Sequence, residues 1–589
     1  MTIRKTWKIL PPAPEKFHRK FPGHSPIVLN LLYHRIYNFG KGKKQFKKAV
    51  KAFFHPDYEN DLHDPFLIKD MRRAGKRILK AVKKKEKIAI FGDYDVDGVT
   101  SVTILYDTLR QLKTQPIIYI PNRQSEGYGL NLSALKYLKK QGVNLIITVD
   151  CGIRDLTEIE KIQRKGVDVI ITDHHLPGSK LPSAFAIINP HCEKRYPFSE
   201  LSGAGVAFKL ACALIELSSP GTYPVGFDKW LLDLVALGTI ADLVPLVGEN
   251  RALAKYGLLV LGKTRRPGLR AIFASSRLPL SAKTPPDTSQ ISFQIAPRLN
   301  AAGRMDHANV SFALLTSEKK AEAKKIAEDL GQKNSRRQRL TDKIVAEIEN
   351  KLNLKEKLVF TGSPDWPVGI LGLAAGKICE KYARPAFLFN VSEGKCRGSI
   401  RSIEKFKVVP VLEKCRELLL DYGGHDFAGG FTFTAANTKK LAKKLKGLAN
   451  KTLKTTDLAW ETRIDQRINL NAVNWKLLEE IKKMEPFGVG NRLPLFLAEK
   501  VKLIQCQPIG NGDKHLKMWF KAKKEEEEKI FEAIAFSQGA KYCRVAGEKN
   551  PRLDIIFEIS SDEWNGEKKL VLIVRDLRLS PGREMDNTN

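Results

Sequence analysis

The sequence predicts an α/β protein in which a doubly wound parallel-sheet domain is followed by a long helical linker, a second α/β domain and a C-terminal β-barrel. Three observations support this fold class. Short apolar runs alternate with helix-like sequence from residue 87, a charged and periodic stretch covers residues 317–355, and strand-like segments dominate after residue 456. Alternating strands and helices are typical of parallel sheets, whereas closely spaced short strands are typical of barrels.

The length of 589 residues exceeds what a single hydrophobic core supports, so several domains are expected. We expect five parts: a basic N-terminal segment (1–80), a doubly wound parallel-sheet domain (81–275), a connecting segment with linker helices (276–355), a second α/β domain (356–455) and a barrel domain (456–589).

The composition is strongly basic, with a formal net charge of +35. Residues 1–90 contain 23 Lys and Arg against 7 Asp and Glu, a net charge of +16. Such a surface neutralises phosphate backbones, so nucleic acid is the favoured partner over mere solubility. A membrane surface is disfavoured because the basic runs lack an apolar, aromatic-rich face. No long uncharged apolar stretch or signal-peptide core is found, which predicts a cytoplasmic protein.

Five apolar runs predict the strands of the first domain. They start at residues 87, 116, 144, 167 and 185 and read "KIAIFGDYD", "PIIYIPNR", "NLIITVDCG", "VDVIITDHH" and "FAIINPH". Their spacing suits β-α-β units and therefore a parallel sheet. Ligands of such sheets bind beyond the carboxyl ends of the strands, which is where the acidic residues of these runs fall.

The second half of the chain predicts three further parts. Residues 317–355 have the charge and periodicity of long exposed helices. The glycine-rich segments "CRGSIRSI" and "DYGGHDFAGGF" belong to the second α/β domain, and five strand-like segments after residue 456 suit a barrel of the OB type.

The segment "DYDVDG" imitates a calcium loop. Counted from Asp93, the twelfth position is Ile104 rather than the bidentate glutamate of an EF-hand, and a strand rather than a helix precedes the motif. If the segment is extended, Asp95 and Asp97 project to the same side, about 7 Å apart. That separation suits two metal ions better than one.

Further candidate ligands follow other strands: Asp150, then Asp173, His174 and His175, with Asp242 in helix-like sequence. Adjacent histidines on an extended chain point in opposite directions, so one is expected to face a metal and the other the substrate. An oxygen-rich cluster that contains nitrogen suits Mn²⁺ or Mg²⁺, and two such ions support phosphoester hydrolysis. Each residue alone is better explained as a helix cap or a buried polar group, but their accumulation favours a metal site.

The motifs "DYDVDG", "VDCG", "TDHH" and "ADLVP" resemble, in order, those of the DHH phosphoesterase superfamily. "FQIAPRLNAAGRM" and "GGHDFAGG" resemble further motifs of the bacterial RecJ family of single-strand-specific DNA exonucleases. The resemblance spans nearly the whole chain and implies a DHH domain, linker helices, a DHHA1 domain and an OB-type domain.

The resemblance also implies roles for individual residues. Metal ligands would be Asp95, Asp97, Asp150, His174 and Asp242, with Asp150 bridging. His175 would be the substrate-side catalytic histidine, and Asp173 would orient the histidine pair. Residues expected to bind substrate phosphates are Arg123, Arg298, Asn300, Arg304, Ser399, Arg401 and His425.

One position departs from the superfamily. Its pyrophosphatase members have a histidine ligand four residues before Asp95, and here that residue is Phe91. The first metal therefore either lacks a ligand or uses Asp93, so we expect one site to bind its ion loosely.

The function implied is a cytoplasmic, two-metal exonuclease that removes 5′-mononucleotides from single-stranded DNA in the 5′ to 3′ direction during repair and recombination. The family further implies single-strand-binding protein and a RecQ-type helicase as partners, and a monomer is expected. Two alternatives are a DHH phosphodiesterase of short oligonucleotides and a non-catalytic single-strand-binding scaffold.

Overall fold

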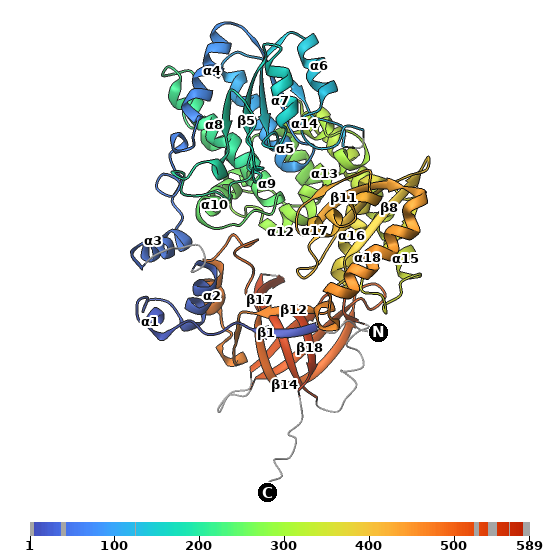
Figure 1. Cartoon of the computed structure of the whole chain (residues 1–589). Coiled ribbons are helices and arrows are strands. Elements are labelled where there is room, and N and C mark those ends of the chain that lie inside the picture. The colour runs from blue at the N-terminus through green and yellow to red at the C-terminus, as the bar shows by residue number, and fades with distance from the viewer. Residues whose placement is uncertain are drawn as a thin grey trace. The chain divides into compact units, whose positions relative to one another are not determined.

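The computed structural model describes residues 5–36, 43–123, 125–522, 529–539, 551–564 and 566–580. These residues divide into two compact units (Figure 1). The first contains residues 57–460, and the second combines residues 5–56 with the chain after residue 460. Each unit is described by itself below.

The first unit begins with a five-stranded parallel sheet in the order β3-β2-β4-β5-β6, which confirms the predicted parallel fold. The strands are β2 (Lys87–Phe91), β3 (Ile117–Tyr119), β4 (Val143–Val149), β5 (Asp168–Thr172) and β6 (Ala186–Ile188). Each begins within a few residues of the corresponding apolar run.

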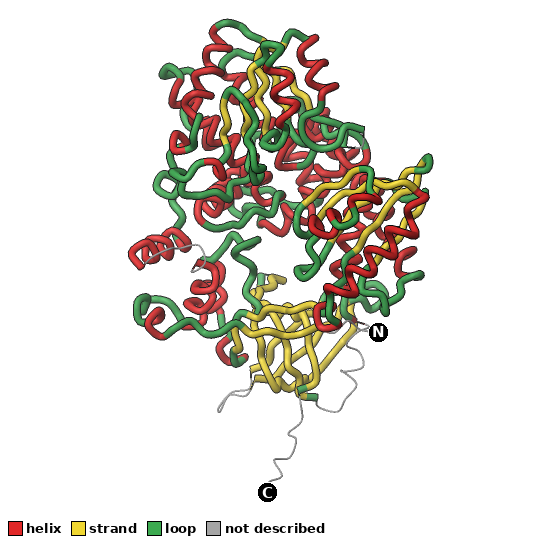
Figure 2. The backbone as a smooth tube through the Cα atoms, viewed as in Figure 1, coloured by secondary structure: helices red, strands yellow, loops and turns green. Residues whose placement is uncertain are grey.

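Helices cover both faces of this sheet (Figure 2). Along β2, Ile88 and Ile90 enter one core while Ala89 and Phe91 enter another, because successive side chains of a strand point to opposite faces. The helices on the first face are α4 (Met71–Lys83), α5 (Val96–Gln111), α8 (Gly203–Leu217) and α9 (Phe227–Ala241); those on the second are α6 (Leu132–Lys140) and α7 (Leu156–Gln163). The sheet is therefore doubly wound, as predicted.

A helical region connects this sheet to the next. Its helices are α10 (Gly248–Gly262), α11 (Pro267–Ser275), α12 (Thr288–Gln290), a π-helical turn (Ile291–Ile295), α13 (Ala296–Met305), α14 (Asn309–Thr316) and α15 (Lys320–Glu349). The helix α15 is the predicted linker helix, continuous over 30 residues.

The second sheet of this unit has the order β10-β11-β9-β8-β7. Its strands are β7 (Val359–Ser363), β8 (Ala386–Ser392), β9 (Lys395–Arg401), β10 (Asp421–Gly424) and β11 (Ala428–Thr434), with helices α16 (Val368–Tyr382), α17 (Val408–Glu413) and α18 (Thr438–Thr452). Only the β7 and β8 pair is parallel. Apolar residues from both α15 and α16 line its core, so the linker helix belongs to this layer too.

The second unit is a closed barrel, which confirms the predicted OB-type architecture. Its strands run β14-β15-β16-β18-β17, and β17 pairs back to β14. They are β14 (Phe496–Ile509), β15 (His515–Ala522), β16 (Lys529–Ala535), β17 (Arg552–Trp564) and β18 (Glu567–Leu579). Closure removes the exposed sheet edges and surrounds a core with four fully buried rings, Phe496, Phe520, Phe531 and Phe557.

The N-terminal elements of the second unit share the barrel's core. They are β1 (Lys5–Ile9), α1 (Glu15–His18), α2 (Pro26–Ile36) and α3 (Lys43–Phe54); β1 pairs with β12 (Trp460–Ile464), and β13 (Gln466–Arg467) and α19 (Trp475–Lys482) follow. Arg35 on α2 forms a buried ion pair with Asp465 at 3.2 Å. Residues 5–56 therefore fold together with the C-terminal barrel.

Within the described residues, none of the helices is both long and apolar enough to cross a membrane.

Candidate metal centre

The acidic motif after β2 does not continue as an extended segment. Asp95 is the N-cap of α5, where its Oδ1 accepts a hydrogen bond from the Gly98 amide at 3.0 Å. Asp97 lies in the first turn of that helix. The predicted strand-like alternation was therefore wrong: a capping aspartate satisfies the free amides of the helix start, and the chain turns directly after Asp95.

The carboxylate of Asp97 is buried against the N-terminus of α8. Its Oδ2 accepts from the Gly203 amide at 2.6 Å, and its Oδ1 accepts from the Ala204 amide at 2.9 Å. Close approach requires glycine here, because a Cβ on Gly203 would lie 2.7 Å from the Asp150 Cβ. The positive end of a helix thus fixes Asp97 while leaving lone pairs for a cation.

Asp150 follows β4 in a left-handed backbone conformation with a φ of 60°. Its carboxylate is 3% exposed, and its Oδ1 is a buried oxygen without a hydrogen-bond partner. Because buried polar atoms are nearly always paired, this oxygen indicates a missing ligand.

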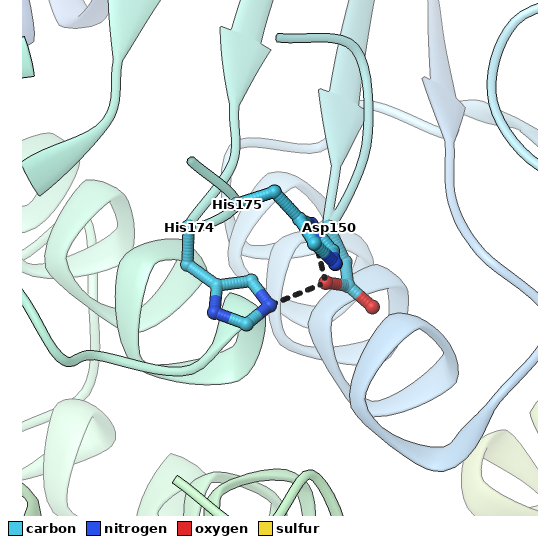
Figure 3. Close-up of side chains that lie close together, drawn as sticks. All are labelled: Asp150, His174 and His175. Carbon is cyan, nitrogen blue, oxygen red and sulfur yellow. Dashed lines mark ion pairs between the residues drawn. The ribbon is translucent and has the colours of Figure 1, made fainter. Parts of the chain in front are cut away.

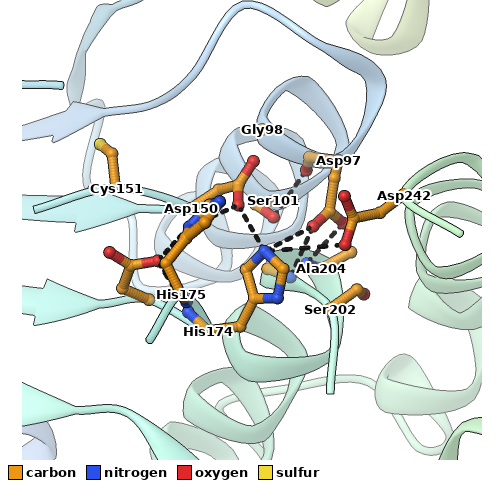
Figure 4. Close-up of polar contacts among 12 residues, drawn as sticks. Asp97, Gly98, Ser101, Asp150, Cys151, His174, His175, Ser202, Ala204 and Asp242 are labelled. Carbon is orange, nitrogen blue, oxygen red and sulfur yellow. Dashed lines mark hydrogen bonds and ion pairs between the residues drawn. The ribbon is translucent and has the colours of Figure 1, made fainter. Parts of the chain in front are cut away.

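His174 lies between Asp150 on one side and Asp97 with Asp242 on the other (Figure 4). Its Nε2 is 3.1 Å from Asp150 Oδ1, 3.8 Å from Asp97 Oδ2 and 3.7 Å from Asp242 Oδ2. This nitrogen is also buried without a hydrogen-bond partner. Burial, followed by the proximity of His175, lowers the pKa of His174 to about 4, so its ring is the neutral form that binds metals.

The two histidines do not point in opposite directions, so that prediction was wrong. Their ring centroids lie 4.4 Å apart, and both rings approach the same Asp150 oxygen (Figure 3). After β5 ends at Thr172, the amides of both histidines donate to the Asp173 carboxylate, so the side-to-side alternation of a strand does not continue.

Asp173 orients the pair. It accepts from the amides of His174 at 2.7 Å and Ile153 at 3.0 Å, and it faces His175 Nδ1 at 2.8 Å. Burial would raise the pKa of Asp173, but these partners, above all His175, bring it below its ordinary value. Since an ionised carboxylate only accepts, Nδ1 of His175 carries a proton and Nε2 remains available for the substrate.

The remaining carboxylates repel one another. Burial first, and then neighbouring carboxylates, raises the pKa of Asp97 to about 7 and the pKa values of Asp93, Asp150 and Asp242 as well. Three sets of side chains have ligand atoms within 4.8 Å of one another: Asp93, Asp95 and Asp150; Asp97, His174 and Asp242; and Asp150, His174 and His175. An oxygen-rich donor set with one or two imidazoles fits Mn²⁺ or Mg²⁺.

Phe91 and Asp93 differ in their surroundings. The Phe91 side chain is fully buried on the face of the sheet that α6 and α7 cover, where its ring stacks on Tyr119 with centroids 5.2 Å apart. Asp93 instead belongs to the acidic set that contains Asp95 and Asp150, and its Oδ1 has no hydrogen-bond partner.

A cluster of four arginines from four separate elements lies beside the acidic residues. Its members are Arg123 after β3, Arg304 on α13, Arg337 on α15 and Arg401 on β9. Burial, and then the other three guanidinium groups, lowers the pKa of Arg304 to about 9. Arg123 interacts electrostatically with Asp93, and Arg304 with Asp95, so the two clusters adjoin.

The other predicted phosphate-binding residues lie in different places. Ser399 is next to Arg401, since a Cβ on Gly372 would contact both side chains. Asn300 accepts from the Val96 amide at 3.2 Å and so supports the start of α5. Arg298 turns back onto its own helical segment, where Nη1 donates to the Gln294 carbonyl at 2.7 Å.

His425, in the loop between β10 and β11, completes this set. Burial first, and then the positive charges of Arg154 and His175, lowers the pKa of His425. The His425 ring therefore lies within electrostatic reach of His175.

Sequence reasoning missed two side chains near the centre. Arg337 lies in "NSRRQR", which reads as a solvated helical face, and Tyr128 lies in a loop without a recognisable motif. Only the packing of α15 and of the loop after β3 brings them here.

Known protein families match each part of this arrangement. The DHH family, N-terminal domain, matches residues 87–239, and the DHHA1 domain matches residues 355–451. The fold and the acidic, histidine-containing edge of the first sheet thus place the chain among the DHH-family proteins. The RecJ OB domain matches residues 464–576. The chain belongs to the RecJ family.

Individual relatives agree. The single-stranded-DNA-specific exonuclease RecJ of Bacillus subtilis (strain 168) is 36% identical over 95% of this chain and 69% of its own length. The protein of that name from Haemophilus influenzae is 32% identical over 94% of this chain and 97% of its own length. The crystal structure of RecJ in complex with Mn²⁺ from Thermus thermophilus has a TM-score of 0.82 at 28% identity and covers 98% of this chain and 80% of that chain.

Proposed function

We propose that this chain is a metal-dependent exonuclease that hydrolyses phosphodiester bonds of single-stranded DNA. The observation that carries the proposal is a buried acidic cluster with unsatisfied ligand atoms that interacts electrostatically with a cluster of four arginines. Relatives that match this chain over nearly its whole length are named single-stranded-DNA-specific exonucleases, and solved RecJ structures contain Mn²⁺ or Mg²⁺.

In this proposal, the acidic residues and His174 bind the cations. Two cations would be held by Asp93, Asp95, Asp97, Asp150, His174 and Asp242, with Asp150 shared between them. When bound, the cations supply charge neutralisation at the phosphoryl group and activation of a water molecule.

The protein's own groups hold the substrate and move the proton. His175, kept in one orientation by Asp173, steadies a phosphoryl oxygen or donates a proton to the leaving oxygen. Burial would lower the pKa of His175, but the Asp173 contact raises it overall, which favours the proton-donating form. Arg123, Arg304, Ser399 and Arg401, with His425, would bind phosphates next to the cleaved bond, because guanidinium groups match phosphate geometry.

We further propose that cleavage runs 5′ to 3′ and releases 5′-mononucleotides. Digestion of single strands labelled at either end, with Mg²⁺ and Mn²⁺ compared, tests this. The proposal predicts immediate release of the 5′ label as a mononucleotide, whereas early release of the 3′ label would overturn the polarity. We also propose that the protein acts in the cytoplasm as a monomer. Its partners in repair and recombination would be single-strand-binding protein and a RecQ-type helicase.

The alternatives make different predictions. A phosphodiesterase of short oligonucleotides would prefer dinucleotides to long strands, and a non-catalytic scaffold would bind single strands without cleaving them when Mn²⁺ is added. The barrel argues against the first alternative, because it offers a long strand additional binding surface. The unsatisfied ligand atoms argue against the second.

A further inference from the structure

Tyr128 combines a buried hydroxyl group with an exposed ring. The residue is 49% exposed, yet its hydroxyl lies 3.1 Å from the Asp150 carbonyl and 3.1 Å from His175 Nδ1. A phenol oxygen donates one hydrogen bond and accepts others, so it can donate to the carbonyl while its oxygen faces the Nδ1 hydrogen that His175 donates mainly to Asp173. Tyr128 therefore contacts both the backbone of one candidate ligand and the candidate catalytic histidine.

The carbonyl that accepts the Tyr128 hydrogen bond belongs to a residue with a left-handed backbone. The left-handed backbone of Asp150, with a φ of 60°, turns its carbonyl away from the direction that β4 would give it. Aspartate adopts this conformation more readily than most residues other than glycine, but it is still less populated than the extended form, so hydrogen bonds to neighbours help to hold it. The Tyr128 hydroxyl is one of these neighbours, so its loss would loosen the Asp150 carboxylate, which belongs to two of the three candidate ligand sets.

Residues 126–131, which include Tyr128, are held by their neighbours. Gly127 and Gly129 flank it, each with a φ of 82°, a conformation that other residues rarely adopt. Beside Gly129, the Asp155 carboxylate accepts from the Leu130 amide at 2.8 Å and leaves no room for a side chain on the glycine.

The start of the loop is held in the same way by Glu126. Its carboxylate accepts from the Tyr119 hydroxyl at 2.6 Å, the Asn122 amide at 2.7 Å and Asn131 Nδ2 at 3.1 Å. The Tyr128 ring is thus presented in a set orientation before any ligand arrives.

The ring itself is open to a ligand. It meets His175 in a T-shaped contact, with centroids 5.6 Å apart and an interplanar angle of 67°, so His175 does not cover it by stacking. The next residue after His175, Leu176, is 59% exposed. An exposed aromatic ring next to the candidate catalytic histidine suits a flat, apolar ligand such as a nucleobase.

We infer that Tyr128 is a positioning residue for Asp150 and His175 and that its ring stacks on the nucleobase of the terminal nucleotide. This inference rests on the proposed function, which puts the cleaved phosphodiester at His175 and the attached base one sugar away. Stacking is tolerant of base identity, so a single ring serves all four nucleotides.

Two variants separate the two roles. Tyr128→Phe keeps the ring and removes the hydroxyl, so kcat should fall roughly 10- to 100-fold, the range for residues that orient a ligand, with KM little changed. Tyr128→Leu also removes the ring. The experiment compares single strands whose terminal nucleotide carries a base with strands whose terminal nucleotide is abasic.

The wild-type enzyme should prefer the base-bearing end by roughly 5- to 100-fold in kcat/KM, and Tyr128→Phe should keep this preference while Tyr128→Leu loses it. Tyr137, which is also 49% exposed but lies on α6, provides the control: Tyr137→Leu should behave as wild type. A preference retained in Tyr128→Leu would overturn the stacking role, and an unchanged kcat in Tyr128→Phe would overturn the positioning role. A wild-type protein that cleaves no single-stranded DNA would instead contradict the proposed function itself.

Discussion

The acidic cluster and the arginine cluster both gather buried side chains of like charge within the same unit, but the charges have opposite signs. In the first, burial and like charges raise the pKa values of Asp93, Asp97, Asp150 and Asp242. In the second, burial and like charges lower the pKa of Arg304, and burial chiefly lowers those of Arg337 and Arg401. In both, the protein disfavours the charged form of its own side chains.

The difference between the clusters lies in what relieves the repulsion. Carboxylates and a neutral imidazole attract divalent cations, whereas guanidinium groups attract phosphate. A strand of DNA with its cations would satisfy both clusters together. The acidic cluster therefore depends on the cations and the arginine cluster on the DNA phosphates. Variants in one cluster should affect mainly the binding of its own ligand.

The largest effect is expected from Asp150→Asn. This change keeps the shape of the side chain but removes the charge shared by two of the acidic sets. Cleavage of single strands should fall by more than the roughly 10- to 100-fold typical of residues that only orient ligands, while DNA binding is nearly retained. Turnover and binding are measured separately. Asp421→Asn, at an exposed position of β10, is the matched control, and near-normal turnover in Asp150→Asn would remove the catalytic role.

A smaller effect is expected from Asp93→Asn. Because Phe91 occupies the position where some relatives have a histidine ligand, we expect calorimetric titration of the wild-type protein with Mn²⁺ to show two unequal sites. The variant should weaken one site roughly 10- to 100-fold and leave the other unchanged. Two equal, tight sites in the metal-free wild-type protein would contradict this account of Asp93.

The arginine cluster is tested by Arg337→Gln. Loss of one phosphate contact should weaken binding of a single strand at low salt and reduce the slope of log K against log salt by about 0.7. The rate at saturating DNA should change less than in Asp150→Asn. Arg336→Gln removes the same charge from the exposed side of α15, and an identical slope in both variants would show that Arg337 has no special position.

The smallest effect concerns stability and pH. Because the folded-state pKa of Asp97 is raised to about 7, the folded metal-free protein binds more protons than the unfolded chain above the ordinary pKa. Its free energy of unfolding should therefore fall as pH rises toward about 7, by up to about 1.4 kcal/mol per pH unit for this group. Denaturant unfolding in EDTA and in Mn²⁺ measures this slope, and Mn²⁺ should flatten it. Equal slopes in both conditions would contradict a raised pKa of Asp97 that metal binding relieves.

The sequence by itself determined the parallel sheet, the linker helix and the barrel. Apolar runs such as "NLIITV" and charged periodic stretches such as residues 320–349 encode local structure through side-chain spacing. It also indicated which carboxylates and histidines lie close together, because parallel strands end at one edge. The strand-like reading of Asp95 and Asp97 failed because a capping hydrogen bond to Gly98 outweighs the alternation.

Only the tertiary structure decided which distant groups meet. The amides of Gly203 and Ala204 hold Asp97, Arg337 joins arginines from three other elements, and the Tyr128 hydroxyl reaches Asp150 and His175. None of these contacts leaves a local pattern, because each depends on how helices and loops far apart in the chain pack together. Periodicity reports which face of an element is buried, whereas the identity of its neighbours is set by packing.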